Sequence, residues 1–505
     1  MRPITDLSFD NSYARLHPAF YEVVDPTPLP DPYLVAFNPD AAALLDLDPE
    51  AARDSALPSY LSGATRIPGS EPIAEAYAGH QFGVWVPQLG DGRAFLLGQV
   101  RHGDAIWDLH LKGGGKTRFS RFGDGRSVLR SVIREYLASE ALHGLGIPTS
   151  RALSIVGSDF PVQRETVETA ATLIRLAPSH VRFGTFEYFA SRGEVDRVRE
   201  LADHVIEGHY PDLAGDPDRI RRLFGLVTRR TGVLMAHWMA AGFAHGVMNT
   251  DNMSILGLTL DYGPYGFLDD YDPDFICNHT DVEGRYAFGR QPGIGMWSCA
   301  RLGEALLVTD PALANRPALG SEPDPALAGW QDELESYWKA FTPEYGRLMR
   351  ARIGLLTESK TDPVLFRDLF TLLRDQHVDY TGFLRSLGNF DSTLGAWPED
   401  AAPGLPAGDD RAQLDAWAAG YAARLRAEGS VDVERRVRMG RVNPRYVLRN
   451  WIAQEAIEQA QRKKFGLIED LRRLFAAPYG EHPGMDRFAE PPNATAREIS
   501  VSCSS

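Results

Sequence analysis

Apolar and polar residues follow a strand-like pattern in the first third of the chain. Residues 94–97 form a short apolar run, and residues 106–111 alternate in part with a period of two. Glycine-rich turns separate these segments, and further strands are expected between residues 151 and 176. This pattern predicts a small sheet-rich unit.

Most of the remaining chain has helical periodicity. A helix is predicted at residues 127–145, because Gly146 can cap its C-terminus and Pro148 prevents its continuation. Later helices are expected at residues 220–244, 330–353, 363–387, 412–428 and 444–464. This order of elements, with strands first, then one helix and then a large helical unit, predicts an α+β protein.

The positions of the Pro- and Gly-rich segments predict that the chain has three parts. Residues 1–75 contain a Pro-rich stretch and a short helix at residues 39–47, and are expected to be an N-terminal extension on a core at residues 76–395. Residues 397–410 are rich in Pro, Gly and Asp and are typical of a linker. A helical C-terminal extension with a cysteine-containing tail is expected at residues 396–505.

Composition and charge exclude several classes of function. A net charge of -15 argues against a nucleic-acid surface, and no apolar run is long enough to span a bilayer. The polar start of the chain is unlike a secretory signal. Three cysteines among 505 residues are too few for a disulfide framework, so a cytoplasmic protein is expected. The oligomeric state stays open.

The segment from His245 to Asn252 carries the strongest chemical signal. Its spacing is that of a kinase catalytic loop, H-R-D-x-x-x-x-N, and the D-F-G motif has a counterpart that starts at Asp261. Asn252 and Asp261 offer oxygen ligands for Mg²⁺ or Mn²⁺. Val247 replaces the catalytic aspartate and cannot accept a proton, although Asp251 supplies a carboxylate nearby. Motif and element order together predict a protein-kinase-like bilobal fold.

The sheet-rich part offers groups for nucleotide phosphates. Gly90 and Gly92 form a turn in which backbone N–H groups can approach phosphate oxygens, although a simple hairpin turn gives the same string. Lys112 ends a predicted strand. Glu135 falls on the apolar stripe of the helix 23 residues later, where a carboxylate needs a partner. A Lys112–Glu135 ion pair is therefore predicted.

Further charged groups admit two interpretations each. Asp124 and Gly125 lie in a second glycine-rich turn, which suits either an anion site or a helix N-cap at Asp124. Arg175 and Arg182 flank a proline turn and suit phosphate binding, but two loop arginines are more often solvated. The acidic residues at 269–274 are expected to form a solvated loop.

Several long strings of this chain resemble the selenoprotein O family, which includes the bacterial YdiU proteins. The resemblance covers nearly the whole chain. The matching strings are residues 88–93, 111–115, 123–130, 245–254, 260–264, 442–450 and 502–505. Residues 117–120 depart from the family pattern, but they include none of the expected ligand side chains.

The resemblance implies a kinase-like enzyme that transfers AMP from ATP to Ser, Thr or Tyr hydroxyls of proteins, with ATP reversed relative to kinases. It implies Asp251 as proton acceptor and Asn252 and Asp261 as ligands of Mg²⁺ or Mn²⁺. It places the nucleotide against Gly90, Gly92, Arg93, Lys112, Asp124, Gly125, Arg175 and Arg182, with Glu135 orienting Lys112.

The resemblance also gives meaning to two cysteines, and it leaves rival functions open. Cys277 and Cys503 are expected to form a redox-sensitive disulfide, although an intermolecular bond or no regulation remains an alternative. The rival functions are a uridylyltransferase with Mn²⁺, an atypical protein kinase in which Asp251 replaces the missing aspartate, and a nucleotide-binding scaffold without turnover.

Overall fold

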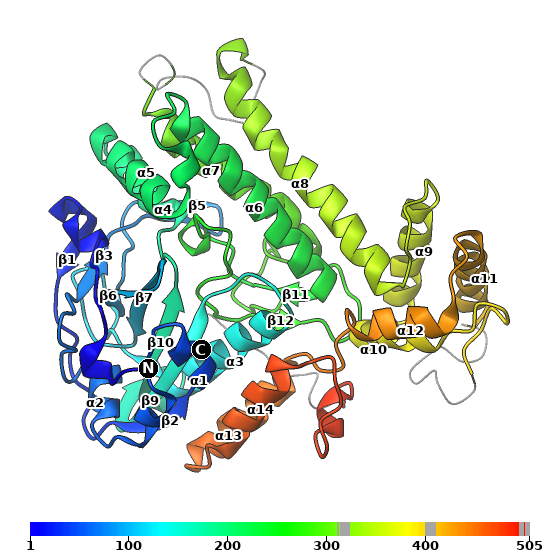
Figure 1. The fold of residues 1–505 in the computed structure, drawn as a ribbon, viewed down its shortest axis with the longest axis horizontal. Coiled ribbons are helices and arrows are strands. Elements are labelled where there is room, and N and C mark those ends of the chain that lie inside the picture. Colours follow the sequence, from blue (N-terminus) through cyan, green and yellow to red (C-terminus); the bar gives the residue numbers. More distant parts are fainter. Residues whose placement is uncertain (311–312, 314–323, 399–410, 494–498, 500–505) are drawn as a thin grey trace.

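The chain folds into a sheet-rich N-terminal region and a helical C-terminal region, as predicted. The computed structural model describes residues 1–310, 313, 324–398, 411–493 and 499. Figure 1 shows the strands on one side and the long helices beyond them. The architecture is therefore α+β.

An antiparallel sheet of eight strands forms the N-terminal region. Seven strands follow the order β1-β3-β6-β7-β10-β9-β2, and β8 pairs with β10. Their bounds are Tyr21–Val23 (β1), Tyr33–Phe37 (β2), Ile73–Glu75 (β3), Ala94–His102 (β6), Ala105–Lys112 (β7), Ser127–Val128 (β8), Arg151–Gln163 (β9) and Val167–Ala177 (β10). The strands predicted within residues 94–176 are confirmed, and they form the middle of the sheet.

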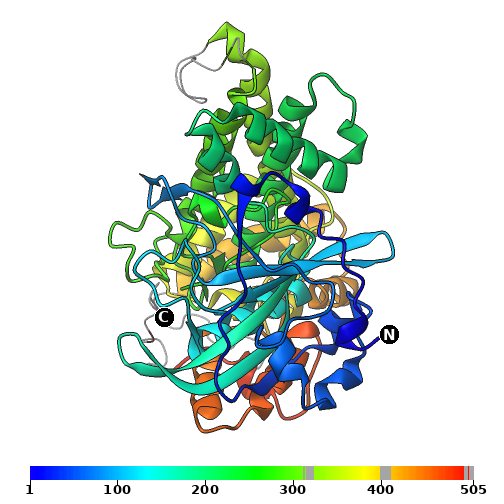
Figure 2. The same cartoon turned by 90° about the vertical axis from the view of Figure 1, so that its left-hand side faces the viewer.

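The first 75 residues contribute both edges of this sheet. They supply β1 and β3 at one edge and β2 at the other, and Figure 2 shows this segment running across the sheet. They also contain two short helices, α1 (Pro39–Ala43) and α2 (Leu57–Leu61). Buried apolar residues of this segment, such as Leu45 and Leu61, pack with Leu109 and Leu111 of β7. The segment is thus integral to the sheet.

One long helix lies against the sheet, and most of the later helices build the second region. The helix on the sheet is α3 (Leu129–Gly144). The others are α4 (Phe183–Ala190), α5 (Val195–His209), α6 (Arg219–Ala241), α7 (Gln291–Leu307), α8 (Ala328–Arg352), α9 (Asp362–Asp375), α10 (Tyr380–Ser386), α11 (Arg411–Ala427), α12 (Asp432–Gly440), α13 (Asn450–Gln461) and α14 (Gly466–Ala476). Among the described residues, none of these helices has the length and apolarity needed to cross a membrane.

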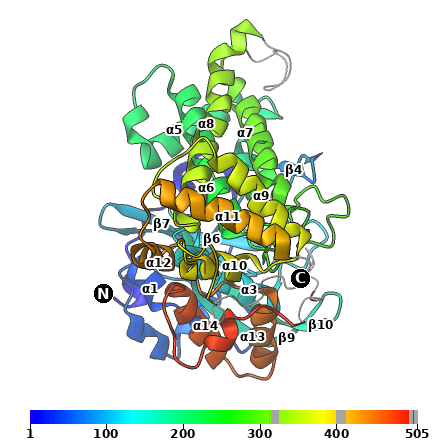
Figure 3. The ribbon, with the colours of Figure 1, turned by 90° about the vertical axis from the view of Figure 1, so that its right-hand side faces the viewer.

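The last two helices return to the sheet-rich region. Figure 3 shows α13 and α14 below α10, and both pack against α3. The approach of α14 is very close, since a Cβ on Gly144 would lie 1.9 Å from the carbonyl oxygen of Phe475. Any larger residue at Gly144 would push α14 away from the helix that carries Glu135.

Three predicted helices differ from the structure at positions where the backbone turns. The helix expected at residues 363–387 is divided into α9 and α10, because His377 has a φ of +50° and Asp379 caps α10 through the N–H of Gly382. The helix expected at residues 220–244 ends at Ala241, where Gly242 adopts a φ of +70°. The helix expected at residues 444–464 begins only at Asn450. The expected linker lies mostly outside the described residues.

Candidate active site

A cavity of about 710 Å³ lies between the sheet and the segment that follows α6. Eleven of the twelve predicted site residues line it, although they are spread over more than 170 positions of the chain. They are Gly90, Gly92, Arg93, Lys112, Asp124, Gly125, Arg175, Arg182, Asp251, Asn252 and Asp261. Its size suits a nucleotide.

The predicted Lys112–Glu135 ion pair is confirmed. Lys112 ends β7, Glu135 lies on the buried face of α3, and the Lys112 ammonium donates to Oε2 of Glu135. Oε1 of Glu135 accepts a second hydrogen bond from Arg175, at 3.2 Å. Burial lowers the pKa of Lys112, and the Glu135 carboxylate opposes that shift. Glu135 itself lies behind the cavity wall and holds two cations toward it.

Arg175 and Arg182 are not solvated loop residues, so that interpretation is wrong. Arg175 lies in β10 and Arg182 precedes α4, and their exposed fractions are 3% and 2%. Each guanidinium donates to one oxygen of Asp261, and Arg182 also donates to the carbonyl oxygen of Asp251 at 2.8 Å. Burial alone would raise the pKa of Asp261, but the two arginines hold it well below its usual range.

Asn252 and Asp261 fit a hard divalent cation. The Asn252 amide nitrogen donates to the carbonyl oxygen of Val247 at 3.0 Å, which leaves the amide oxygen available as a ligand. Each oxygen of Asp261 accepts one arginine hydrogen bond and retains a second lone pair. Amide and carboxylate oxygens are suitable ligands for Mg²⁺ or Mn²⁺.

Asp251 is held in an unusual environment for a carboxylate. Its exposed fraction is 7%, and its Oδ2 accepts a hydrogen bond from the side chain of Gln81 at 3.2 Å. Its Oδ1 is buried and has no hydrogen-bond partner among the described residues. Burial raises the pKa of Asp251 to about 7. A carboxyl with these properties can accept a proton near neutral pH.

The two glycine-rich turns form one wall of the cavity. A Cβ on Gly125 would lie 2.2 Å from the carbonyl oxygen of Gly115, so the second turn can approach the segment that follows β7 only with glycine there. Asp124 does not cap α3, contrary to one interpretation of the sequence, since Val128 precedes that helix. The carboxylate of Asp124 instead pairs with Arg164 at 2.8 Å.

Sequence reasoning missed a buried network behind Arg175. His110 lies opposite Arg175 in the register of β7 and β10, and its Nδ1 accepts a hydrogen bond from Arg175 at 2.9 Å. An arginine can only donate, so the proton of a neutral His110 is on Nε2, which lies 3.3 Å from Oδ2 of Asp91. His110 thus orients Arg175. One signal was readable: His110 and Lys112 share a strand face at period two.

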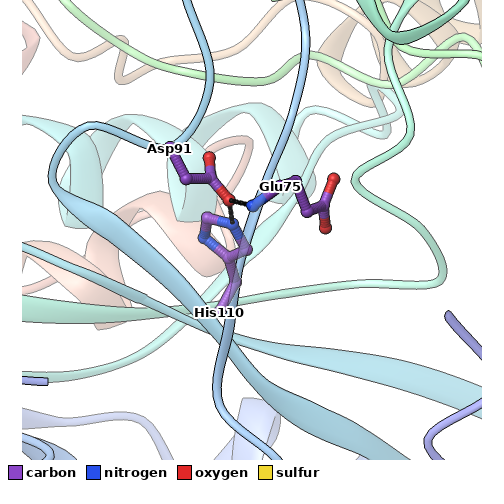
Figure 4. A group of neighbouring side chains, drawn as sticks. All are labelled: Glu75, Asp91 and His110. Carbon is purple, nitrogen blue, oxygen red and sulfur yellow. Dashed lines mark hydrogen bonds and ion pairs between the residues drawn. The ribbon is translucent and has the colours of Figure 1, made fainter. Parts of the chain in front are cut away.

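Asp91, His110 and Glu75 form a cluster with the composition of a metal site. Their ligand atoms lie within 4.8 Å of one another. Both nitrogens of His110 and Oδ2 of Asp91 are already engaged in hydrogen bonds, and Oδ2 also accepts from the Glu75 N–H. Figure 4 shows the Glu75 carboxyl directed away from His110. These three residues therefore form a structural hydrogen-bond network.

The buried His110 should make stability depend on pH. Burial lowers its pKa from 6.5 to about 4, so the unfolded chain binds a proton below pH 6.5 that the native state does not. Native stability should fall by about 2 kcal/mol from this group between pH 7 and pH 5. Denaturant unfolding of wild type and His110→Asn at both pH values tests this. The variant should lack this part of the change in unfolding free energy between pH 7 and pH 5. The control variant His102→Asn, at an exposed histidine, should keep the wild-type pH dependence of the unfolding free energy. The same pH dependence in wild type and His110→Asn would contradict the prediction.

Comparison with known proteins identifies the family. The family model described as "Protein adenylyltransferase SelO" matches residues 3–475. The chain belongs to the SelO family. This membership makes the chain a nucleotidyltransferase.

Relatives of the SelO family resemble this chain over its full length. A protein of Myxococcus xanthus named "Protein nucleotidyltransferase YdiU" is 54% identical over 506 residues, which cover 100% of both chains. Proteins with the same name from Thioalkalivibrio sulfidiphilus and Thiobacillus denitrificans are 53% and 48% identical, again over 100% of both chains. The predicted resemblance is thus confirmed.

The cysteine pair expected from the SelO resemblance stays a prediction. Cys277 is buried, and its thiol donates to the carbonyl oxygen of Ala244 at 3.6 Å. A Cβ on Gly246 would lie 2.6 Å from its sulfur, so this thiol packs directly against the start of the catalytic-loop segment. Cys503 lies outside the described residues.

Proposed function

We propose that this chain transfers AMP from ATP to hydroxyl side chains of proteins, with Mg²⁺ or Mn²⁺. The observation that supports this most strongly is the convergence of cations and metal-ligand groups in one cleft. Lys112, Arg175 and Arg182 are buried there beside Asp261, while Val247 stands where a kinase has its aspartate. These groups suit a triphosphate–metal complex and lack the base of ordinary kinase chemistry.

In this proposal the fold is that of a bilobal protein kinase. The sheet and α3 form the small lobe, and α4 to α10 form most of the large lobe. Residues 1–75 and 396–505 are extensions of a nucleotide-binding core at residues 76–395. ATP lies reversed in the cleft, so its α-phosphate faces the acceptor. The expected compartment is the cytoplasm.

The reaction assigned to the cleft is a displacement at the α-phosphorus. The acceptor oxygen forms a bond to this phosphorus, the bond to the bridging oxygen of the β-phosphate breaks, and pyrophosphate leaves. Asp251 accepts the hydroxyl proton, because its carboxyl is the free base near Val247. Lys112, Arg175 and Arg182 bind the phosphates. Glu135 orients Lys112 and Arg175, and His110 orients Arg175.

The metal would be held by Asn252 and Asp261. When bound, it would neutralise phosphate charge and stabilise the pyrophosphate leaving group. The two arginines that now contact Asp261 can then turn part of their hydrogen-bonding capacity to phosphate oxygens. Each guanidinium has five donors, so it can contact Asp261 and a phosphate oxygen at the same time.

The position of a radioactive label tests this proposal. Protein incubated with Mg²⁺ or Mn²⁺ should incorporate label from α-labelled ATP and not from γ-labelled ATP, and Asp261→Ala should abolish incorporation. Incorporation from γ-labelled ATP would instead establish a kinase. ATP binding without any incorporation would establish a scaffold. A parallel reaction with α-labelled UTP and Mn²⁺ decides between AMP and UMP as the transferred group.

A further inference from the structure

A second cavity adjoins the reactive end of the cleft. It has a volume of about 410 Å³ and lies between residues 280–294 and the tip of the hairpin formed by β4 (Gly79–Gln81) and β5 (Val84–Val86). Phe82, at that tip, lines both this cavity and the nucleotide cleft. The residue before it, Gln81, donates to Asp251. A molecule in the second cavity is therefore next to the proposed proton acceptor.

Hydrogen bonds join this cavity to the catalytic-loop segment. The Phe82 N–H donates to the Tyr286 hydroxyl at 2.9 Å and lies 3.2 Å from Oδ1 of Asn249. The Tyr286 hydroxyl donates to the same Asn249 oxygen at 2.7 Å. Phe82 has a φ of +51°, which is unfavourable for a bulky residue, and these bonds hold it there. The wall between the two cavities is thus fixed in position.

The rim of the cavity has the composition of a protein-binding surface. Val282 on the rim is 88% exposed, and Val84 and Ile276 nearby are 67% and 41% exposed. Ile276 contacts Gly284 and Val84 lies two positions after Phe82, so exposed apolar side chains flank the cavity on both of its walls. The cavity is open to a polypeptide that contributes apolar side chains.

Two arginines, Arg285 and Arg290, line the same cavity together with the carboxylates of Asp281 and Glu283. No carboxylate pairs with Arg285 or Arg290 in the described part of the chain. The Arg285 guanidinium lies 4.6 Å from the ring centre of Trp297, and its buried Nε has no hydrogen-bond partner among the described residues. The nearby Asp281 carboxylate is occupied by the N–H groups of Arg285 and Tyr286. Arg285 is thus available to an external acidic group.

We infer that this second cavity binds the acceptor polypeptide, as an extended segment with an apolar and an acidic residue beside the modified hydroxyl. The apolar residue packs against Phe82 and Val282, and the acidic residue pairs with Arg285. The hydroxyl then passes Phe82 to reach Asp251. This inference rests on the proposed function, which requires a protein acceptor near that carboxylate.

Synthetic peptides with one serine, threonine or tyrosine test the inference. Peptides flanked by leucine and glutamate should be modified about tenfold more efficiently than peptides flanked by leucine and lysine. Arg285→Glu should reverse this preference, while Arg285→Lys should keep it. Val282→Glu should raise the acceptor KM about tenfold with the ATP KM unchanged. The matched control is Val433→Glu, because Val433 is 74% exposed on α12, away from both cavities.

Several outcomes would overturn the inference. Equal acceptor KM values for Val282→Glu and Val433→Glu would do so, as would an unchanged preference in Arg285→Glu. A change of sedimentation coefficient in Val282→Glu would instead assign the surface to a second copy of this chain. Fluorescence anisotropy of the labelled peptides without nucleotide separates this test from the proposed function. Selective binding of the acidic peptides would support the cavity assignment even if no label is transferred. Binding without this selectivity would refute the assignment even if AMP is transferred.

Discussion

Asp261→Ala should lower nucleotide transfer by at least about a thousandfold, because the variant lacks the carboxylate that we propose as a ligand of the metal. The same variant should still bind ATP in metal-free buffer. Asp261 is now the shared acceptor of Arg175 and Arg182, so its removal leaves two buried guanidinium groups without their carboxylate. Phosphate oxygens can replace that carboxylate. Transfer should therefore be lost in Asp261→Ala, while equilibrium binding of ATP in EDTA is retained.

The matched control for Asp261→Ala is Asp274→Ala. Asp274 lies 13 positions after Asp261, in the acidic stretch of residues 269–274, and its side chain is exposed. Its substitution should change neither transfer nor ATP binding. Loss of metal-free ATP binding in Asp261→Ala would show that the two arginines need this carboxylate to keep their positions. The role of Asp261 would then be structural first, and the proposed metal role would lose its main support.

The parts of the site that are local in sequence could be predicted. The spacing from His245 to Asn252 and the position of Glu135 on an apolar stripe follow from loop and helix geometry over a few turns. A buried carboxylate requires a cation, so Lys112 was a reasonable partner for Glu135, and the structure pairs them. Local periodicity and the cost of an unpaired buried charge are sufficient to predict the positions and partners of these residues.

The parts that depend on strand pairing could not be predicted. Arg175 and His110 are brought together by the register of β7 and β10, which a single sequence does not specify. For the same reason the sequence predicts Arg175 in a loop, although the residue is buried in the sheet. The edge position of β1 and β2 depends on long-range pairing as well. The break between α9 and α10 depends on a left-handed His377, for which the sequence carries no glycine or proline signal.

Asp251→Asn should lower the rate of transfer by about a hundredfold or more, since general-base assistance is typically of that size. It should also stabilise the protein. The wild-type carboxylate is buried with one oxygen unpartnered, and an amide of the same shape carries no charge there. Because burial raises the pKa of Asp251 to about 7, the wild-type charge costs more at pH 8 than at pH 5. The gain, about 1–3 kcal/mol at pH 8, should therefore shrink at pH 5.

The opposite signs of the two effects separate catalysis from structure. Denaturant unfolding in metal-free buffer measures the stability, and α-label incorporation measures the rate. Asp362→Asn is the matched control, because Asp362 is also buried but accepts from Arg424 at 2.8 Å and from the Ser359 N–H at 2.9 Å. It should lose stability and keep activity. If Asp251→Asn is both less stable and less active, then Asp251 supports the loop; only a more stable and less active variant fits a carboxylate retained for chemistry.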